Sequence, residues 1–546
     1  MNVAYLWAKT DREGGSAWHP LLLHVLDVAA SAEAILKREP DSTRKRMAQV
    51  LGLEWDAAKP WLLLIISCHD LGKASPAFQK KWEEGYRDLC PKAGLPSNLP
   101  GIDTSKNHAF ISQVVLAEIL KGRTWEGELA DLVADAVGCH HGERMSHARR
   151  DQLECDRRAL GDQKWAEARR SIFDELMKVF GPQETPTKDA LTGTDFMLLA
   201  GLTSFADWIG SNTEFFPFGT PEDCADLASW WKQSQQKAEG ALDAVGWVPR
   251  SPLLSESKSF EAVFPNLVQP RPLQRAIVKA VQELDEPSVL LIEAPMGEGK
   301  TEAAFYAHLE LQRRFGHRGL YVALPTKATG NAMFERTQAF LNSLSPTRSI
   351  DLQLLHGAAL LNDAFQKIRL APVYNPDGDG GVHAGEWFTN KKRALLSEYG
   401  VGTVDQALLP ILPVRHNFVR LWGLANRVVV FDEIHAYDTY TGTLLLQLIQ
   451  WLNHLGSSVV LLSATVPPKF RQELAGKLSV SLPEQETSYP RLSVFANGAV
   501  KQASFKADSG RVLEIRIKGI PVDVDSLKRE VLEGLSVTGM GMILVN

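Results

Sequence analysis

The sequence predicts a multidomain protein in which an all-α domain is followed by an α/β domain built on a parallel sheet. In residues 1–245, apolar residues recur at the spacing of buried helix faces. Beyond Pro270 the pattern changes to short, fully apolar runs, which are typical of strands buried on both faces of a parallel sheet. A segment rich in Pro and Ser, residues 246–268, separates the two patterns and is predicted to be a linker.

Individual helices and strands can be placed within this outline. Apolar residues recur at helical spacing in Leu21–Leu36, Trp61–Cys68, Phe110–Leu120, Leu129–Val137 and Phe196–Ile209. Few strand-like alternations of apolar and polar residues interrupt these segments. In the second half, buried strands are predicted at Val289–Ile292, Leu320–Leu324, Val428–Phe431 and Val459–Leu462. Helix-like stretches lie between these strands, and this alternation predicts a doubly wound parallel sheet.

Composition limits the classes of protein to consider. At 546 residues the chain is too long for one core, and roughly 150 residues per domain gives three or four units. No apolar run nears the ~20 residues of a membrane helix, and the N-terminus carries acidic residues and glycines instead of a secretory signal. The 5 cysteines have no Cys-x-x-Cys spacing, which indicates reduced thiols. We therefore expect a cytoplasmic protein with no membrane contact.

The net charge of -6 argues against a globally basic nucleic-acid binder. Any contact with a phosphate backbone must then come from local grooves and backbone amides.

Histidines and aspartates of the first half have the composition of a metal site. His69 and Asp70 follow an apolar helical run, and adjacent helical side chains point about 100° apart, so one can face one ion while the other bridges two. Imidazole and carboxylate together suit Mn, Fe, Co, Ni or Zn better than Mg. Two ions roughly 3.5 to 4 Å apart can activate water and neutralise the phosphorane of phosphodiester hydrolysis. The candidate ligands are His24, His69, Asp70, His108, His140, His141 and Asp207.

Two nearby residues have less specific signals. Lys73 is a candidate contact to the scissile phosphate, and a solvated lysine after a helix end is equally plausible. His19 precedes Pro20, and because Pro favours the first helical position, we predict a structural role for His19 before the helix of His24.

In its order along the chain, this set of residues resembles the HD phosphohydrolase superfamily. The resemblance implies an all-α domain in which His69 and Asp70 are catalytic. It also implies a divalent transition-metal cofactor, two ions drawn from Mn, Fe, Co or Ni.

A phosphate-binding loop is the clearest motif of the second half. A predicted strand ending at Glu293 leads into the run APMGEGKT. Gly297 and Gly299 let backbone amides wrap phosphate oxygens at a helix N-terminus. Lys300 would then meet the β- and γ-phosphates, and the hydroxyl of Thr301 would bind Mg.

An acidic pair follows a later strand in the run RVVVFDEIH. Asp432 can hold Mg through water, and Glu433 can polarise the attacking water. Asp-Glu is common on surface turns, but here it comes directly after a buried strand and downstream of a phosphate loop. The two motifs together predict a site for Mg-ATP.

The order of the second-half motifs is similar to that of superfamily two helicases of the DEAD/H type. That resemblance implies adenine recognition by Gln274, contact with the nucleic-acid backbone at Thr326, Gly357 and Thr403, and coupling of hydrolysis to movement by His435, Ser463 and Thr465. Taken singly, Pro325-Thr326 or Gly402-Thr403 is as well explained by an ordinary strand-to-helix turn.

A nuclease followed by a motor resembles the CRISPR-associated helicase-nuclease of type I interference. The resemblance divides the chain into an HD nuclease domain (1–245), a linker (246–268), a first RecA-like helicase domain (269–490) and the incomplete start of a second RecA-like domain (491–546). Because the second domain supplies arginines that complete the ATP site in this family, we expect the 546 residues alone to hydrolyse ATP poorly.

The function implied is a metal-dependent single-stranded DNA endo/exonuclease coupled to an ATP-dependent 3′ to 5′ DNA helicase. It would degrade foreign DNA at R-loops made by a CRISPR RNA-guided surveillance complex, with the displaced strand and that complex as partners. Two alternatives stay open: an HD phosphohydrolase of small nucleotides with a regulatory motor half, and an RNA helicase with an inactive HD domain.

Overall fold

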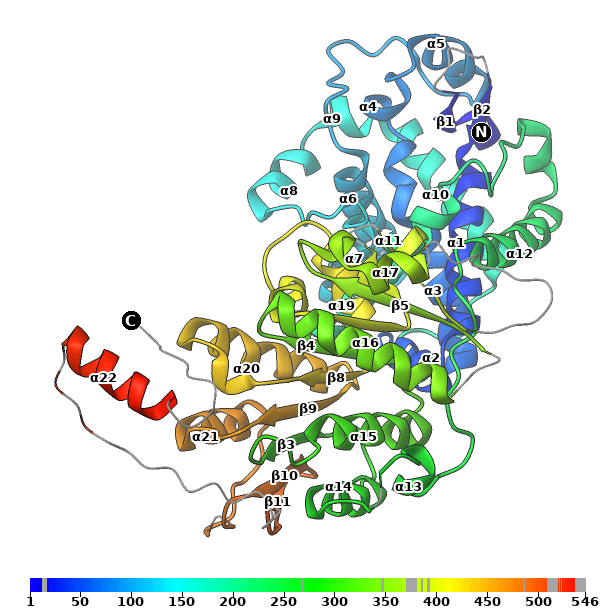
Figure 1. The fold of residues 1–546 in the computed structure, drawn as a ribbon. Coiled ribbons are helices and arrows are strands. Elements are labelled where there is room, and N and C mark those ends of the chain that lie inside the picture. Colours follow the sequence, from blue (N-terminus) through cyan, green and yellow to red (C-terminus); the bar gives the residue numbers. More distant parts are fainter. Residues whose placement is uncertain are drawn as a thin grey trace.

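The computed structural model describes residues 1–11, 17–267, 269–344, 348–369, 381–383, 386–389, 393–485, 487–507, 519, 521 and 523–535. Figure 1 shows a helical half, drawn from blue through cyan to blue-green, beside an α/β half drawn from green to orange. The predicted fold class, an all-α domain followed by an α/β parallel-sheet domain, is confirmed.

The helical half is organised around α1, whose 18 residues are almost all buried between α3, α11 and α12. The helix begins after Pro20, and α11 begins with a capping box in which Thr192 and Asp195 exchange side-chain and backbone hydrogen bonds. The helices of this half are α1 (Leu21–Arg38), α2 (Asp41–Gln49), α3 (Trp55–Ser67), η2 (Cys68–Lys73), α4 (Pro76–Gln79), α5 (Glu83–Lys92), α6 (His108–Lys121), α7 (Gly127–Gly138), α8 (His147–Glu154), α9 (Arg157–Leu160), α10 (Gln163–Phe180), α11 (Gly193–Gly210) and α12 (Leu227–Ala244). A hairpin that the sequence patterns did not indicate, β1 (Trp7–Thr10) with β2 (Trp18–Pro20), precedes them.

The α/β half is built on a sheet whose described strands run in the order β11-β10-β3-β9-β8-β4-β7-β5-β6. The strands from β3 to β6 in this order pair in parallel, and the central ones are buried along their whole length, as their unbroken apolar runs predicted. The strands are β3 (Val289–Glu293), β4 (Leu320–Leu324), β5 (Ser349–Leu355), β6 (Gly381–His383), β7 (Tyr399–Thr403), β8 (Val428–Phe431), β9 (Ser458–Ser463), β10 (Arg491–Ala496) and β11 (Ala499–Ser504).

Helices precede and connect these strands (Figure 1). They are α13 (Phe260–Val263), α14 (Pro272–Gln282), α15 (Lys300–Phe315), α16 (Lys327–Leu344), α17 (Asp363–Arg369), α18 (Val404–Leu408), α19 (Asn417–Leu424), α20 (Thr439–His454) and α21 (Pro468–Lys477). A further helix, α22 (Val524–Leu535), comes after the last described strand and lies apart from the sheet in Figure 1.

The boundary expected at residues 490/491 falls inside the sheet. Strand β10 pairs antiparallel with β3, with Phe495 opposite Val289, and β11 pairs with β10. The first α/β unit therefore extends at least to Ser504, because an antiparallel edge hairpin completes its sheet. The terminal run Gly541–Asn546, expected to open a second RecA-like sheet, lies outside the described residues.

The segment expected to be a linker, residues 246–268, is described up to residue 267 and contacts both halves. Trp247 is fully buried, and its carbonyl accepts a hydrogen bond of 2.7 Å from Arg38. Arg250 lies 3.4 Å from the buried Glu398 of the α/β half. The segment is thus anchored by Trp247 and Arg250, while residues 251–252 and 255–259 are exposed.

The two halves share one hydrophobic core. Helix α11 of the helical half crosses α19 so closely that a Cβ on Gly201 would lie 2.7 Å from the carbonyl oxygen of Phe418. A buried ion pair of 2.9 Å between Arg318 and Glu39 also joins the halves. The geometry of the helical half is therefore fixed partly by the α/β half.

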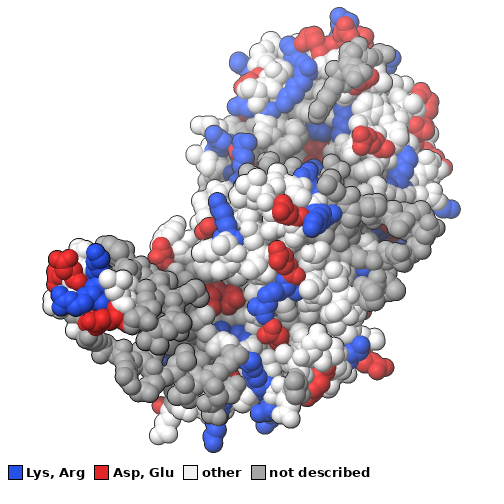
Figure 2. Space-filling model, viewed as in Figure 1, with Lys and Arg blue, Asp and Glu red and all other residues white. Residues whose placement is uncertain are grey.

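The described surface is of mixed charge. In Figure 2 the described Lys and Arg residues are interspersed with Asp and Glu, in keeping with a net charge of -6. Among the described residues, none of the helices combines the length and the apolar character needed to cross a membrane.

Candidate metal centre and nucleotide-binding site

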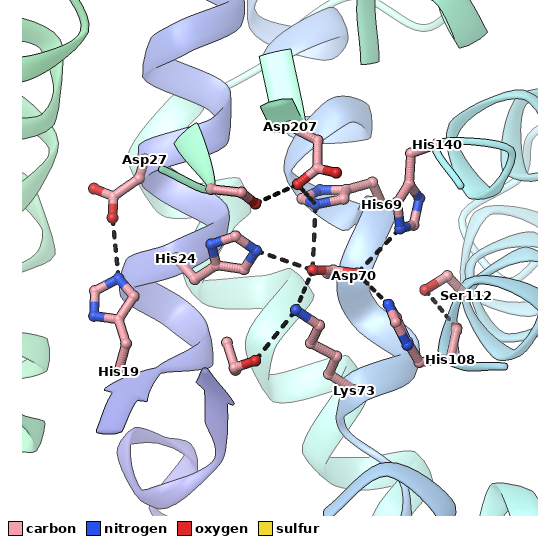
Figure 3. A network of polar contacts seen from close by, with 12 residues as sticks. His19, His24, Asp27, His69, Asp70, Lys73, His108, Ser112, His140 and Asp207 are labelled. Atoms are coloured by element: carbon pink, nitrogen blue, oxygen red, sulfur yellow. Dashed lines mark hydrogen bonds and ion pairs between the residues drawn. The ribbon is translucent and has the colours of Figure 1, made fainter. Parts of the chain in front are cut away.

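The seven candidate ligands, scattered between residues 24 and 207, lie together in one cluster. Figure 3 shows six of them, and four of the seven, His24, His69, Asp70 and His140, are buried. They come from the middle of the helical half: His24 from α1, His69 and Asp70 from η2, His108 from the first turn of α6, His140 and His141 from the turn after α7, and Asp207 from α11.

Asp70 is at the centre of this pocket. Its Oδ2 lies 2.9 Å from His24 Nε2 and 3.3 Å from His69 Nε2. Its Oδ1 lies 3.2 Å from His108 Nε2 and 3.4 Å from His140 Nε2. The carboxylate thus lies between two groups of side chains with converging ligand atoms, which are His24, His69 and Asp207 on one side and His108, His140 and His141 on the other, and it forms a third such group with His69 and His140.

Two of the imidazoles are oriented by backbone carbonyls. His69 Nδ1 donates to the Ile66 carbonyl at 2.9 Å, and His140 Nδ1 donates to the Val137 carbonyl at 3.1 Å. Since a carbonyl can only accept, each Nδ1 carries the proton, and each Nε2 of a neutral ring offers a lone pair. Neither Nε2 makes a hydrogen bond within the described part of the chain, and neither does Asp70 Oδ1.

Such buried ligand atoms, held by a second layer of hydrogen bonds, fit a divalent transition metal. The same layer includes residues that the sequence reasoning did not single out. The hydroxyl of Ser211, the C-cap residue of α11, donates to Asp207 Oδ1 at 2.6 Å. Ser112 of α6 accepts from the Gly72 amide at 2.8 Å and so fixes η2. The spacing of Ser211, four residues after Asp207, was the available signal for the first of these.

Burial and opposite charge compete in setting the pKa values of this pocket. Burial lowers the pKa of His108 to about 3 and that of His141 to about 4, so both rings are neutral ligands at pH 7. Burial also opposes the charged form of His69, but the Asp70 and Asp207 carboxylates outweigh it and raise the pKa of His69 to about 9. Metal binding at this ring therefore has to displace a proton.

Lys73 belongs to the same pocket, with its Nζ 2.7 Å from Asp70 Oδ2. His19 is outside it. Its Nε2 donates to Asp27 at 3.0 Å, and its Nδ1 accepts from the Gly219 amide at 3.0 Å. Both ring nitrogens are thereby used in hydrogen bonds that hold the start of α1, as expected of a structural histidine.

The predicted phosphate loop connects β3 to α15. Gly297 and Gly299 have φ values of 82° and 77°, in the left-handed region that favours glycine. Lys300 begins α15, and its Nζ donates to the Ala294 carbonyl at 2.8 Å. Burial lowers the pKa of Lys300. The negative charges of Glu433 and Asp432 oppose that shift, because the acidic pair lies close enough to the loop to act on Lys300.

The acidic pair follows β8. The Glu433 amide donates to Asp432 Oδ1 at 2.9 Å, and Glu433 itself has a φ of 52°. Burial, with the charge of Glu433, raises the pKa of Asp432. His435 Nδ1 lies 3.2 Å from Glu433 Oε2 and 3.3 Å from Ser463 Oγ, so a continuous chain of polar contacts runs from the acidic pair to the end of β9.

The weaker motifs gather at the same edge of the sheet. The register pairs Glu293 with Ser463 and Leu324 with Thr403, so the carboxyl ends of β3, β9, β4 and β7 lie side by side. Ligands of open parallel sheets bind at this edge. Thr403 and Ser463 are the last residues of β7 and β9. The motif residues Thr326, Gly357 and Thr465 follow β4, β5 and β9, and Thr301 lies in the first turn of α15.

Gln274 approaches the phosphate loop from α14. Its Nε2 donates to the Gly299 carbonyl at 3.4 Å, and its Oε1 accepts from the Arg271 amide at 2.9 Å.

The two sites belong to domains of known families. Residues 7–216 match the family model described as "Cas3, HD domain", and residues 271–474 match "DEAD/DEAH box helicase". A protein of Thermus thermophilus named "CRISPR-associated endonuclease/helicase Cas3" is 40% identical over 99% of this chain. The chain is thus similar to a Cas3 protein along nearly its whole length.

Further Cas3 relatives agree in sequence and in fold. The Escherichia coli protein of the same name is 31% identical over 90% of the chain. A crystal structure titled "T. fusca Cas3-AMPPNP" superposes with a TM-score of 0.83 at 29% identity, covering 98% of this chain and 60% of that one. The chain spans 58% of the Thermus thermophilus Cas3 and 57% of the Escherichia coli Cas3.

Proposed function

We propose that the chain is a metal-dependent nuclease of single-stranded DNA joined to an ATP-driven DNA motor that acts in CRISPR defence. The observation that carries the nuclease assignment is the position of Asp70 between two groups of imidazole and carboxylate ligands. A carboxylate shared in this way is suited to bridge two cations. The matches to a Cas3 HD domain and to a DEAD/DEAH box helicase support the pairing of a nuclease with a motor.

The side chains would have different roles in phosphodiester hydrolysis. His24, His69 and Asp207 would hold one ion, and His108, His140 and His141 the other. Two bound divalent ions of this kind supply a deprotonated water and neutralise the charge of the phosphorane. Lys73, 2.7 Å from Asp70, is in position to pair with a phosphate oxygen beside the ligands. The burial of His24, His69 and His140 keeps bulk water from these rings and strengthens their interactions.

For the motor half, we propose that Lys300 and the Gly297 and Gly299 amides bind the phosphates of ATP. Asp432 and Thr301 would hold Mg, and Glu433 would orient the attacking water. Gln274 would recognise the adenine, and His435, Ser463 and Thr465 would couple hydrolysis to movement along a strand that contacts Thr326, Gly357 and Thr403. The order of these segments along one sheet edge supports this assignment.

The proposed partners are the displaced DNA strand of an R-loop and a CRISPR RNA-guided surveillance complex, in the cytoplasm. Cleavage would begin within the displaced strand and continue as the motor moves 3′ to 5′. A solved structure titled "CRISPR RNA-guided surveillance complex, pre-nicking" contains a chain that superposes with a TM-score of 0.71 at 25% identity.

The test is a metal-by-substrate screen of the purified chain. Circular single-stranded DNA, duplex DNA, RNA, and free or cyclic nucleotides are each incubated with Mn, Co, Ni, Zn or Mg after chelator treatment. We expect cutting of the circle, which has no ends, with transition metals and none by Asp70→Asn. Turnover of nucleotides without DNA cutting would instead support a small-nucleotide phosphohydrolase. No bound metal and no cutting would support a helicase with an inactive HD domain.

A further inference from the structure

A residue of the motor half reaches the wall of the metal centre. The turn before α19 carries His416, whose backbone amide donates to the Gly142 carbonyl at 3.4 Å. Gly142 directly follows the candidate ligands His140 and His141. The His416 ring covers this glycine so closely that a Cβ on Gly142 would lie 2.9 Å from His416 Nε2. Glycine is further required there because its φ is 93°.

The same ring touches the other side of the pocket. His416 packs edge-on against Trp208, with ring centroids 5.3 Å apart and an interplanar angle of 63°. Trp208 directly follows the candidate ligand Asp207 on α11. Asp207 and His141 belong to the two different ligand groups that Asp70 separates. One side chain of the motor half therefore contacts the neighbours of ligands from both groups.

His416 is also held in place by the motor half, to which it belongs. It is buried to 8% exposure and adopts the left-handed conformation with φ of 58°. The helix that it precedes, α19, packs against α11 beside the close contact at Gly201 (Figure 1). After α19 the chain enters β8, which ends at the acidic pair of the nucleotide site. Ordinary packing between the halves would explain the burial of His416. It would not explain the strained backbone of His416, which directs the ring at Gly142.

We propose that His416 is a positioning residue for the metal centre, which fixes the Gly142 loop and Trp208 from the motor half. The proposal rests on the proposed nuclease function. Residues that orient metal ligands without binding the metal typically contribute 10- to 100-fold in metal affinity or activity. We expect an effect near the lower end of that range, because His416 acts through the neighbours of the ligands.

The decisive variant is His416→Gly, which accepts the left-handed backbone and removes the ring. Arg415→Ala is the matched control: Arg415 is the adjacent residue, and its hydrogen bond of 2.6 Å to Glu143 touches the same loop, but its side chain is 71% exposed. Mn and Ni affinity of the full chain is measured by titration calorimetry. Amide exchange of residues 139–144 is measured in chelator, without metal.

His416→Gly is expected to weaken metal binding about tenfold, to speed amide exchange at the loop, and to lower kcat on single-stranded DNA with little change in KM. Arg415→Ala should match the wild type in all of these. His416→Asn, which also tolerates left-handed backbone, should lose affinity in the same direction, and it decides the matter if the Gly variant does not fold.

Wild-type affinity and exchange in a folded His416 variant would overturn the positioning role while leaving the nuclease intact. Failure of the wild-type chain to bind metal or cut DNA would overturn the proposed function itself, and the positioning role with it.

Discussion

Lys73 Nζ lies 2.7 Å from Oδ2 of Asp70, the carboxylate around which the candidate ligands gather. Both side chains are almost completely buried, and Lys73 also donates to the Ala8 carbonyl at 3.2 Å. A buried ammonium here competes with cations for Asp70, but it also offers a donor to a substrate phosphate. Loss of the Lys73 ammonium should therefore favour metal binding and impair catalysis.

Replacing Lys73 by Met should therefore separate them. Single-stranded DNA cleavage is expected to fall about 10- to 100-fold, the loss of one charged hydrogen bond of ~1.5–3 kcal/mol. Mn affinity should be unchanged or higher because a competing cation is gone. Calorimetry and steady-state kinetics on the same preparation measure both quantities. A variant that loses metal and activity together would show that Lys73 holds the pocket together and does not act on substrate.

The central position of Asp70 predicts a change in metal stoichiometry. Asp70→Asn removes charge from both ligand groups and should abolish binding of both ions, whereas Asp207→Asn affects the group with His24 and His69 and should leave one. Elemental analysis after removal of free metal counts the ions. Loss of both ions in each variant would mean that the two groups bind metal only as one unit.

Metal should also stabilise the folded chain, because ligands converge only in the native state. At a free metal concentration about 100-fold above Kd, the expected gain is about 2.7 kcal/mol, seen as a higher melting temperature than in chelator. Asp70→Asn serves as the control and should show no such shift. An equal shift in that variant would place the stabilising metal elsewhere on the chain.

The two sites should be separable by single substitutions. Lys300→Ala removes the cation of the phosphate loop and should abolish nucleotide binding, measured with a fluorescent ATP analogue. Metal-dependent cutting of single-stranded circles should persist. Asp70→Ala should do the reverse, losing cutting and keeping nucleotide binding. If the Lys300 variant lost metal-dependent nicking, cutting at the metal centre would depend on nucleotide binding, and the two sites would not be separable.

Sequence patterns predicted the parts of this molecule whose signals are local. Unbroken apolar runs predicted β3, β4, β8 and β9, because a strand buried on both faces needs no polar residue. The ligand types of the candidate centre could also be read from the chain. The antiparallel pairing of β10 with β3 could not, since it joins residues about 200 positions apart with nothing local to indicate it.

The arrangement within the metal pocket was equally beyond local patterns. That Asp70 separates two ligand groups depends on how four helices and η2 converge. His416 gave no signal at all, because its partner Gly142 belongs to the other half and looks like an ordinary helix-ending glycine. That contact arises from packing between the two halves, which a linker between independent domains did not lead us to expect.

A histidine remote from both sites predicts how stability depends on pH. His308 of α15 is fully buried, and neither ring nitrogen makes a hydrogen bond within the described residues. Burial lowers the pKa of His308 to about 3, from an ordinary value of 6.5. Below pH 6.5 the unfolded chain gains a proton at this residue and the folded chain does not, so stability falls with falling pH until about pH 3.

Between pH 7 and pH 5 this residue should cost the wild type about 2 kcal/mol of stability. His308→Leu removes the titrating group, so its stability relative to the wild type should rise by that amount over the same interval. Denaturant unfolding in chelator at both pH values measures the difference. His454→Gln, at an exposed position of α20, is the control and should leave the pH dependence of the wild type unchanged. A His308 variant with the same pH dependence as the wild type would mean that the folded chain protonates His308 as readily as the unfolded one.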